Sequence, residues 1–378
     1  MKLYHLVRMK EKCSLKMKKI AIVRYNLSKI GGAEKVAINM ANELSRFYDV
    51  KLVSILLDEN GFINYDINSN VELVNFFKGD IRIRTAILKL TSKLREYIKK
   101  EKIEVIFSIA PLTNIMIKLA TIGLKVKIVF CDHHSLEFQD GRSRKIQRYI
   151  GAKFFDKVIT LTEEDRLKYS QQYNIPITKV DSIYNWIDEV NSNNIKYDKL
   201  AKKIVTVGRF HNQKGYDYLA EVAIKVLSKH PEWQWDIYGS GDKIIENALN
   251  RKLVQGGVLS QVNFKGNVKG TENIYPNHSI YVMTSRYEGL PLVLLEAQQY
   301  NLPIVSFSCP TGPNEIVENG VNGYLVECYD TDKLSEELLE LMEDEVLRQS
   351  FSEHAKDNMD KFDKDKILNQ WIELIETI

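Results

Sequence analysis

The sequence lacks any apolar run long enough to cross a membrane, and the basic segment from Met1 to Lys19 lacks the apolar stretch of a signal peptide. We therefore expect the protein to remain in the cytoplasm. Cysteine is scarce, and the residues Cys13, Cys131, Cys309 and Cys328 lack the spacing of a disulfide framework or a zinc site. All four are expected to be free thiols.

The length predicts two domains, because 378 residues exceed the size at which a single hydrophobic core stops growing. Short β-branched runs alternate with helical patterns, as in parallel sheets covered on both faces. We expect an α/β fold of two Rossmann-like, doubly wound domains that face each other across a cleft. The first should span residues 1–186, the linker 187–202 and the second domain 203–362, and a helix at 363–378 could cross back to the first domain. Residues 1–16 are either native to the first domain or an upstream extension.

The expected strands are short apolar runs whose carboxyl ends should meet at one edge of each sheet, where doubly wound folds bind ligands. They are Ile20–Val23, Val50–Leu56, Val105–Ile109, Lys127–Phe130, Val158–Leu161, Ile204–Val207, Trp235–Tyr238, Val262–Lys265, Ile280–Met283, Ile304–Phe307 and Tyr324–Val326. Helical spacing of apolar residues predicts one helix from Ala33 to Leu44 and another from Lys364 to Ile378.

Charge is distributed unevenly along the chain. Residues 1–190 hold 33 Lys and Arg against 22 Asp and Glu, whereas residues 191–378 hold 20 against 28. The first half therefore suits an anionic partner, and nucleic acid, anionic lipid and a diphosphate-linked acceptor all qualify.

An apolar strand leads into the segment from Thr284 to Glu296, the most informative part of the sequence. Gly289 permits a tight turn and Pro291 suits a first helical turn, so a helix should begin at the proline. The turn, with Leu290 and Leu292, would then present backbone N–H groups and a positive dipole end to an anion.

Two carboxylates accompany this helix, Glu288 at its mouth and Glu296 inside it. Their spacing of eight positions leaves them within about 80° of each other on a helix. A carboxylate beside a bound diphosphate would be repelled unless it accepted hydrogen bonds from sugar hydroxyls. We therefore interpret the pair as a sugar-binding feature.

A second group of polar residues follows the strand Ile204–Val207, in the segment Gly208-Arg-Phe-His-Asn-Gln-Lys-Gly215. Arg209 and Lys214 should lie at the carboxyl end of that strand. Two cations at that place match the charge of a diphosphate.

Together these motifs resemble glycosyltransferase family 4, whose members are retaining enzymes of the GT-B fold, and the resemblance covers nearly the whole chain. It implies that Arg209 and Lys214 bind the donor diphosphate, that Glu288 holds hydroxyls of the donor sugar and that Glu296 holds the ribose. The bacterial members that build surface glycans are the most similar. The resemblance favours a UDP-sugar donor and a glycan or lipid-linked acceptor.

Three further segments match family motifs more weakly. Gly31 and Gly32 correspond to a glycine-rich loop that approaches the donor phosphates and the acceptor, although they could equally form a plain helix entry. His133, with His134 as the next candidate, would point at the donor sugar. Glu315 could meet the sugar or the nucleotide, or lie in a surface loop.

We expect no metal and no other cofactor, because no Asp-x-Asp stands beside a strand, and the cations and the helix dipole can stabilise the leaving diphosphate. The basic amphipathic segment Arg84–Lys100, with Arg142–Arg148, suits the inner face of an anionic plasma membrane, or else packs on its own domain. No motif that reads nucleic acid is present, and we expect none to bind.

Two alternatives to sugar transfer stay open at this point. Nucleotide-sugar epimerases share the fold and would use the same phosphate-binding crevice. A second alternative is a non-catalytic subunit that binds the donor or a partner and supports another transferase.

Overall fold

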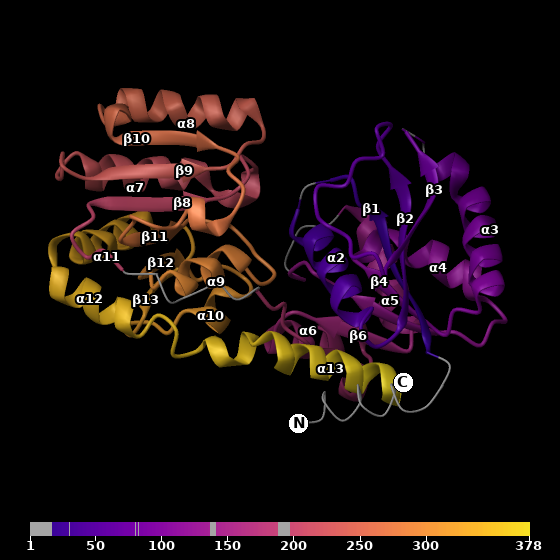
Figure 1. Cartoon of the computed structure of the whole chain (residues 1–378). Coiled ribbons are helices and arrows are strands. Elements are labelled where there is room, and N and C mark those ends of the chain that lie inside the picture. The colour runs from indigo at the N-terminus through magenta and orange to yellow at the C-terminus, as the bar shows by residue number, and fades with distance from the viewer. Residues whose placement is uncertain (1–16, 30, 80, 82, 137–140, 188–196) are drawn as a thin grey trace. The chain divides into compact units, whose positions relative to one another are not determined.

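The computed structural model describes residues 17–378 except residues 30, 80, 82, 137–140 and 188–196. Cys13, the segment 1–16 and most of the expected linker therefore lie outside the described residues. The chain forms two compact units, one of Met1–Asn185 with Lys364–Ile378 and one of Trp186–Asp363. Each unit is an α/β domain with a parallel sheet, as the alternating pattern predicts (Figure 1).

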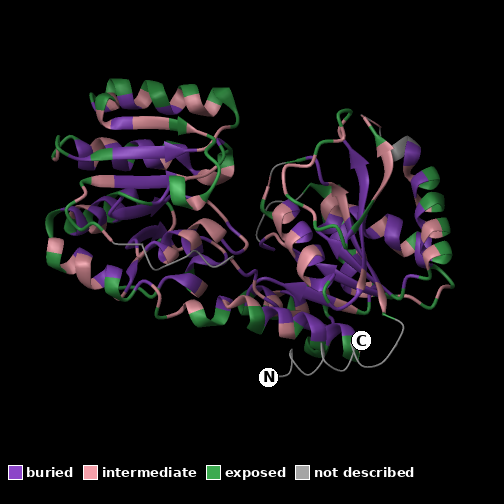
Figure 2. Cartoon of the chain, viewed as in Figure 1, coloured by how far each residue is buried: buried purple, intermediate pink, exposed green. Residues whose placement is uncertain are grey.

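The first unit has a seven-stranded sheet in the order β3-β2-β1-β4-β5-β6-β7. Its strands are β1 (Lys19–Asn26), β2 (Asp49–Leu57), β3 (Glu72–Lys78), β4 (Val105–Ile109), β5 (Lys127–Cys131), β6 (Lys157–Thr160) and β7 (Val180–Ser182). Its helices are α2 (Gly32–Leu44), α3 (Ile83–Glu101), α4 (Asn114–Thr121), α5 (Arg142–Phe154), α6 (Glu163–Tyr173) and α13 (Lys364–Thr377). Helices cover both faces of the sheet, so the central strands are buried (Figure 2).

The last helix, α13, belongs to the first unit although it follows the second unit in sequence. Trp371 packs edge-on against Phe107 of β4, with ring centroids 5.7 Å apart. The Tyr48 hydroxyl lies 2.7 Å from the Glu376 carboxylate. Burial of one apolar face of α13, including Trp371, against the first unit explains why the helix docks there.

The second unit has a six-stranded sheet in the order β10-β9-β8-β11-β12-β13. Its strands are β8 (Lys203–Val207), β9 (Gln234–Tyr238), β10 (Val262–Gly266), β11 (Ile280–Met283), β12 (Ile304–Phe307) and β13 (Gly323–Val326). Its helices are α7 (Tyr216–Leu227), α8 (Lys243–Gln255), α9 (Leu292–Gln299), α10 (Pro313–Ile316), α11 (Thr331–Glu343) and α12 (Glu345–Glu353). Because β8 pairs with β11, the loops that follow these two strands leave the same edge of the sheet side by side.

Every strand expected from the apolar runs is present, and β3 and β7 are additional. β3 is an edge strand with the sequence ELVNFFK, and most of its side chains are exposed or half-buried. β7 comprises only three residues at the opposite edge. No residue of β3 is fully buried and β7 is very short, so neither gave a clear apolar run in the sequence.

Candidate functional site

The loop after β8 and the loop after β11 are joined by hydrogen bonds in the second unit. The Thr284 hydroxyl donates to the carbonyl oxygens of Lys214 and Gly215, at 3.2 and 3.1 Å. Gly215 has φ +64°, and a Cβ there would stand 2.0 Å from the Thr284 carbonyl oxygen. Only glycine fits this close approach, so it fixes the position of Lys214 beside the second loop.

Lys214 and Glu288, which the sequence placed in separate motifs, form an ion pair across these loops. The Lys214 ammonium lies 2.7 Å from the Glu288 carboxylate, and the two side chains are only 19% and 9% exposed. The other carboxylate oxygen accepts a hydrogen bond from the Gln213 amide at 3.3 Å. Partial burial strengthens the pair, because less water screens the charges.

The backbone of Glu288 is held by the loop that follows β12. Its N–H donates to the Pro310 carbonyl, and its own carbonyl accepts from the Thr311 N–H, both at 2.9 Å. Gly312, with φ +96°, approaches so closely that a Cβ would stand 2.3 Å from the Gly289 carbonyl oxygen. The carboxyl ends of three neighbouring strands thus converge around Glu288.

Helix α9 begins at Leu292, with Pro291 as its N-cap residue. The helix was expected to start at the proline, so the prediction was one residue early. No side chain caps this end of α9. Its first backbone N–H groups are therefore available to a ligand, beside the buried Leu290 and the half-buried Leu292.

The expected helical relation between Glu288 and Glu296 is wrong, because Glu288 precedes the helix. Glu288 faces Lys214, whereas Glu296 accepts a hydrogen bond from the Tyr275 hydroxyl at 2.8 Å. Tyr275 is fully buried and stacks on Tyr300, with ring centroids 5.4 Å apart. The two carboxylates are therefore held by different neighbours.

The remaining predicted residues of this unit have different surroundings. Arg209 is exposed and lies on the same loop as Lys214. Glu315 is half-buried in α10, 4.0 Å from the Lys361 ammonium. Arg286, which sequence reasoning missed, bridges the loops: it donates to the Asn212 carbonyl at 2.7 Å.

In the first unit, a buried ion pair holds the loop after β5. The Asp132 carboxylate lies 2.7 Å from the Arg148 guanidinium and also contacts the Tyr169 hydroxyl. It accepts the backbone N–H of His134 at 3.2 Å. Burial alone would raise the pKa of Asp132, but Arg148, His134 and Tyr169 hold that pKa below its usual range. Asp132 is therefore a charged anchor for the loop that carries both predicted histidines.

His133 is half-buried near the start of this loop, and its ring nitrogens have no hydrogen-bond partner among the described residues. Burial, together with the nearby charges of His134 and Arg24, lowers its pKa to about 3. The imidazole is therefore neutral near pH 7. A neutral ring can donate from one nitrogen and accept at the other.

The glycine-rich segment is held by a second ion pair. Glu34 is buried and accepts hydrogen bonds from Arg24 at 2.5 and 3.0 Å. Gly31 is the N-cap residue of α2, and a Cβ there would stand 2.6 Å from the Glu34 carboxylate. At Gly32, the structure leaves open space around the position of a Cβ. Only Gly31 is thus constrained by its neighbours.

The basic segments proposed for membrane contact are only partly surface features. In α3, Leu90, Leu94 and Ile98 are buried in the core of the first unit, so its main apolar face is not available to lipid. Arg148 is 2% exposed because it pairs with Asp132, and it adds nothing to a basic surface. The rest of α5 still exposes basic and apolar residues, including Arg142 and Ile146.

Among the described residues, no group of three or more His, Cys, Asp and Glu is placed to hold a metal ion. Within the same part of the chain, no helix combines the length and the apolar character needed to span a bilayer.

Comparison with known proteins identifies the family of both halves of the chain. Residues 30–190 match the model of Glycosyltransferase Family 4, and residues 201–344 match the model of Glycosyl transferases group 1. An uncharacterized glycosyltransferase of Haemophilus influenzae is 30% identical over 94% of this chain and 99% of its own length. The α-1,4-N-acetyl-D-galactosaminyltransferase of Campylobacter jejuni that acts on an undecaprenol-linked glycan is 25% identical over 96% and 99%.

Solved structures agree on the fold. TarM of S. aureus, in complex with UDP, has a TM-score of 0.77 at 17% identity and covers 95% of this chain and 99% of its own. HepE of Anabaena, also with UDP, has a TM-score of 0.78 at 17% identity over 96% and 100%. With two Rossmann-like units, the joined loops around Lys214 and Glu288, and family matches over both halves, the chain is a glycosyltransferase of the GT-B fold and belongs to glycosyltransferase family 4.

Proposed function

We propose that this enzyme moves a sugar from a UDP-sugar to an acceptor hydroxyl, with retention at the anomeric carbon, in the synthesis of a bacterial surface polysaccharide or lipid-linked glycan. The observation that carries the proposal is the Lys214–Glu288 ion pair beside the uncapped start of α9. Similarity to an amylovoran biosynthesis glycosyltransferase of Erwinia amylovora and to the Campylobacter transferase supports the acceptor class.

The donor diphosphate would bind between Lys214 and the first N–H groups of α9. An ammonium and a helix start both favour a nearby anion, and Arg209 on the same loop adds a second cation. When the glycosidic bond breaks, its electron pair goes to the diphosphate oxygen, and the charge grows beside these groups. Stabilisation that increases with this charge lowers the barrier to transfer.

Glu288 would serve the sugar rather than the phosphate. The incoming diphosphate would pair with the same Lys214 ammonium that Glu288 contacts. The Glu288 oxygens would then be less engaged by Lys214 and could accept other hydrogen bonds. Sugar hydroxyls can then donate to them. Glu296, oriented by Tyr275, would accept from the hydroxyls of the ribose in the same manner.

On the acceptor side, the Asp132–Arg148 pair would keep the loop of His133 and His134 in place. A neutral His133 suits a hydrogen bond to a sugar hydroxyl better than it suits the transfer of a charge. For retention, the acceptor oxygen would attack on the face that the diphosphate leaves, and the acceptor proton would pass to the departing diphosphate oxygen. Several relatives bear names of α-linking transferases, which supports this stereochemistry.

The experiment is a screen of UDP-sugars for release of UDP, with and without a lipid extract of the cell envelope as acceptor. We expect one donor to give release that depends on the acceptor, with the same rate in EDTA because Lys214, Arg209 and α9 replace a metal. Conversion of the sugar without transfer would refute the proposal, and loss of release in EDTA would refute the metal-free part.

We also propose that α5 contacts the inner face of an anionic membrane. Arg142, Ile146, Tyr149 and Lys153 recur at spacings of three and four residues, and Ile146 and Tyr149 are 54% and 48% exposed. Cations with exposed apolar side chains on one helical face suit a lipid surface of negative charge. Such contact would bring the enzyme to a lipid-linked acceptor.

Co-sedimentation with vesicles tests this surface. The protein should bind vesicles that contain phosphatidylglycerol more strongly than neutral vesicles, and Ile146→Ser with Tyr149→Ser should reduce binding about tenfold. Val346→Ser, at an exposed apolar site of α12, is the matched control and should leave binding unchanged. Equal binding of the double variant and the native protein would rule out α5 as the contact.

A further inference from the structure

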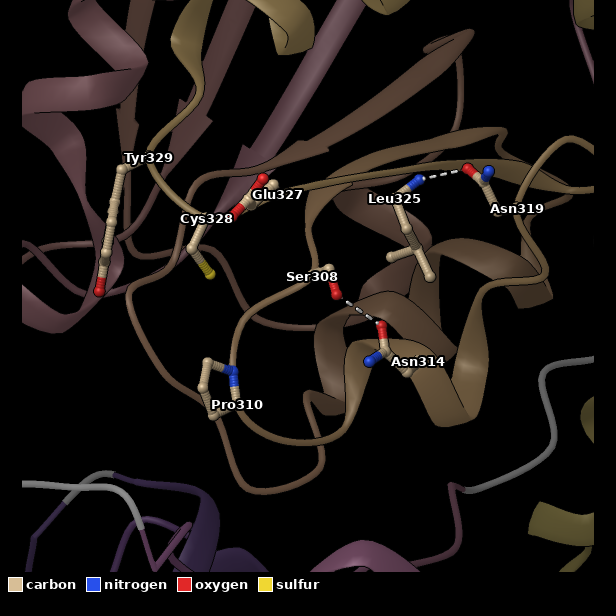
Figure 3. Close-up of a pocket in the computed structure, with 8 residues that line it drawn as sticks. All are labelled: Ser308, Pro310, Asn314, Asn319, Leu325, Glu327, Cys328 and Tyr329. Atoms are coloured by element: carbon tan, nitrogen blue, oxygen red, sulfur yellow. Dashed lines mark hydrogen bonds between the residues drawn. The ribbon is translucent and has the colours of Figure 1, made fainter.

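The second unit has a pocket of about 570 Å³ beyond the Lys214–Glu288 pair (Figure 3). It lies where the loops that follow β12 and β13 leave the sheet. Its lining residues are Ser308, Pro310, Asn314, Asn319, Leu325, Glu327, Cys328 and Tyr329. The proposed roles of the donor site use none of them.

Tyr329 forms one side of the pocket under backbone strain. Its φ is +73°, in the left-handed region that costs a non-glycine residue free energy, yet its side chain is 51% exposed. Tyr218 and Phe307 hold its ring, with centroids 5.3 and 6.4 Å away. Burial does not account for a large aromatic at this position, whereas a ligand that packs on the ring would.

The other side of the pocket carries amide groups. Asn314 accepts the Ser308 hydroxyl through its carbonyl oxygen at 3.0 Å, and Asn319 accepts the Leu325 N–H through its own at 2.8 Å. Figure 3 shows both amides oriented by these bonds. Each oriented amide keeps its NH₂ group as a hydrogen-bond donor for a ligand.

The charge of the lining residues disfavours an anionic ligand. The Glu327 side chain has no ion-pair or hydrogen-bond partner among the described residues, and none of the lining residues is Lys or Arg. A phosphate or a carboxylate would be repelled by Glu327 and would find no cation among the lining residues. A neutral sugar offers hydroxyl donors for the carboxylate, hydroxyl acceptors for the amides and an apolar ring face for Tyr329.

We propose that this pocket binds a neutral sugar residue of the acceptor glycan, an inference that rests on the proposed function. Pro310 lines the pocket, and its carbonyl also accepts the Glu288 N–H, while the next residue, Thr311, donates to the Glu288 carbonyl. A sugar bound there therefore lies beside the donor site but contacts separate residues. The enzyme would thus recognise a part of the acceptor other than the hydroxyl that reacts.

The test is saturation-transfer NMR of methyl glycosides of glucose, galactose, GlcNAc and GalNAc, with the protein saturated with UDP. We expect at least one glycoside to bind, and Tyr329→Gly to weaken it about tenfold. Because glycine fits the left-handed backbone, the melting temperature of this variant should not fall in parallel. Asn277→Gly, at another exposed residue with positive φ, is the matched control and should bind as the native protein does.

A Glu288→Gln variant separates this pocket from the donor site. Glycoside binding that survives in Glu288→Gln and is lost in Tyr329→Gly supports the pocket. Loss of glycoside binding in Glu288→Gln but not in Tyr329→Gly would place the sugar in the donor site and overturn the inference. Binding of inorganic phosphate at Tyr329 would contradict a neutral sugar as the ligand and would also overturn it. Acceptor-dependent release of UDP by the native enzyme reports on the proposed function separately, because glycoside binding is measured with UDP and involves no transfer.

Discussion

Replacement of Lys214 by methionine should lower the rate of sugar transfer at saturating donor by about 10²- to 10³-fold. The structure fixes the Lys214 ammonium at the carboxyl edge of the sheet, 2.7 Å from Glu288. Its charge would act most strongly when the bond to the sugar breaks, so the loss should fall on kcat more than on binding of the donor. The measurement is acceptor-dependent release of UDP under steady-state conditions.

Lys243→Met is the matched control for this result. Lys243 opens α8, is exposed, and among the described residues pairs only with Glu246, three residues later. The same change of charge and shape there should leave kcat within about twofold, since an exposed pair of this kind contributes little. A Lys214→Met enzyme that kept the native kcat would exclude Lys214 from stabilising the leaving group.

Replacement of Arg148 by methionine should lower the free energy of unfolding of the first unit by about 3 to 5 kcal/mol. The Asp132 carboxylate, buried in its loop, would lose its counter-ion, and an unpaired buried charge is strongly destabilising. Urea denaturation measures the loss. Hydrogen exchange of β5 and α6 assigns it to the first unit, because two domains need not unfold together.

Two further variants distinguish the effect of losing the ion pair from the effect of changing the shape of the side chain. Arg142→Met, on the exposed face of the same helix, should change the free energy of unfolding by less than about 0.5 kcal/mol. Asp132→Leu combined with Arg148→Met should recover part of the loss, because it leaves no buried charge. A single Arg148→Met protein as stable as the native one would show that the pair does not hold this loop.

Much of the fold could be predicted from the sequence, because buried parallel strands require continuous apolar runs. Such runs located β8, β11 and β12 in the second unit and β1 and β4 in the first. They failed at β3 and β7, the edge strands of the first sheet, although they located the edge strands β10 and β13 of the second. No residue of β3 is fully buried and β7 is only three residues long, so neither forms a continuous apolar run.

The site was predictable only where residues follow a strand directly. Arg209, Lys214 and Glu288 could be assigned to the edge of the sheet because β8 and β11 end just before them. The partners of the site residues could not be predicted, because Gln213 contacts Glu288, and Arg148 contacts Asp132, only in the folded structure. Arg148 was misread as surface charge because its helical position alone does not reveal a buried carboxylate opposite it.

Binding of UDP and UMP, measured by isothermal titration calorimetry on the native enzyme and on Lys214→Met, tests the central claim most directly. If Lys214 and the start of α9 bind the diphosphate, the native enzyme should bind UDP at least about tenfold more tightly than UMP, and Lys214→Met should lose most of that difference. Equal affinity of the native enzyme for the two nucleotides, or an unchanged preference in Lys214→Met, would contradict the claim.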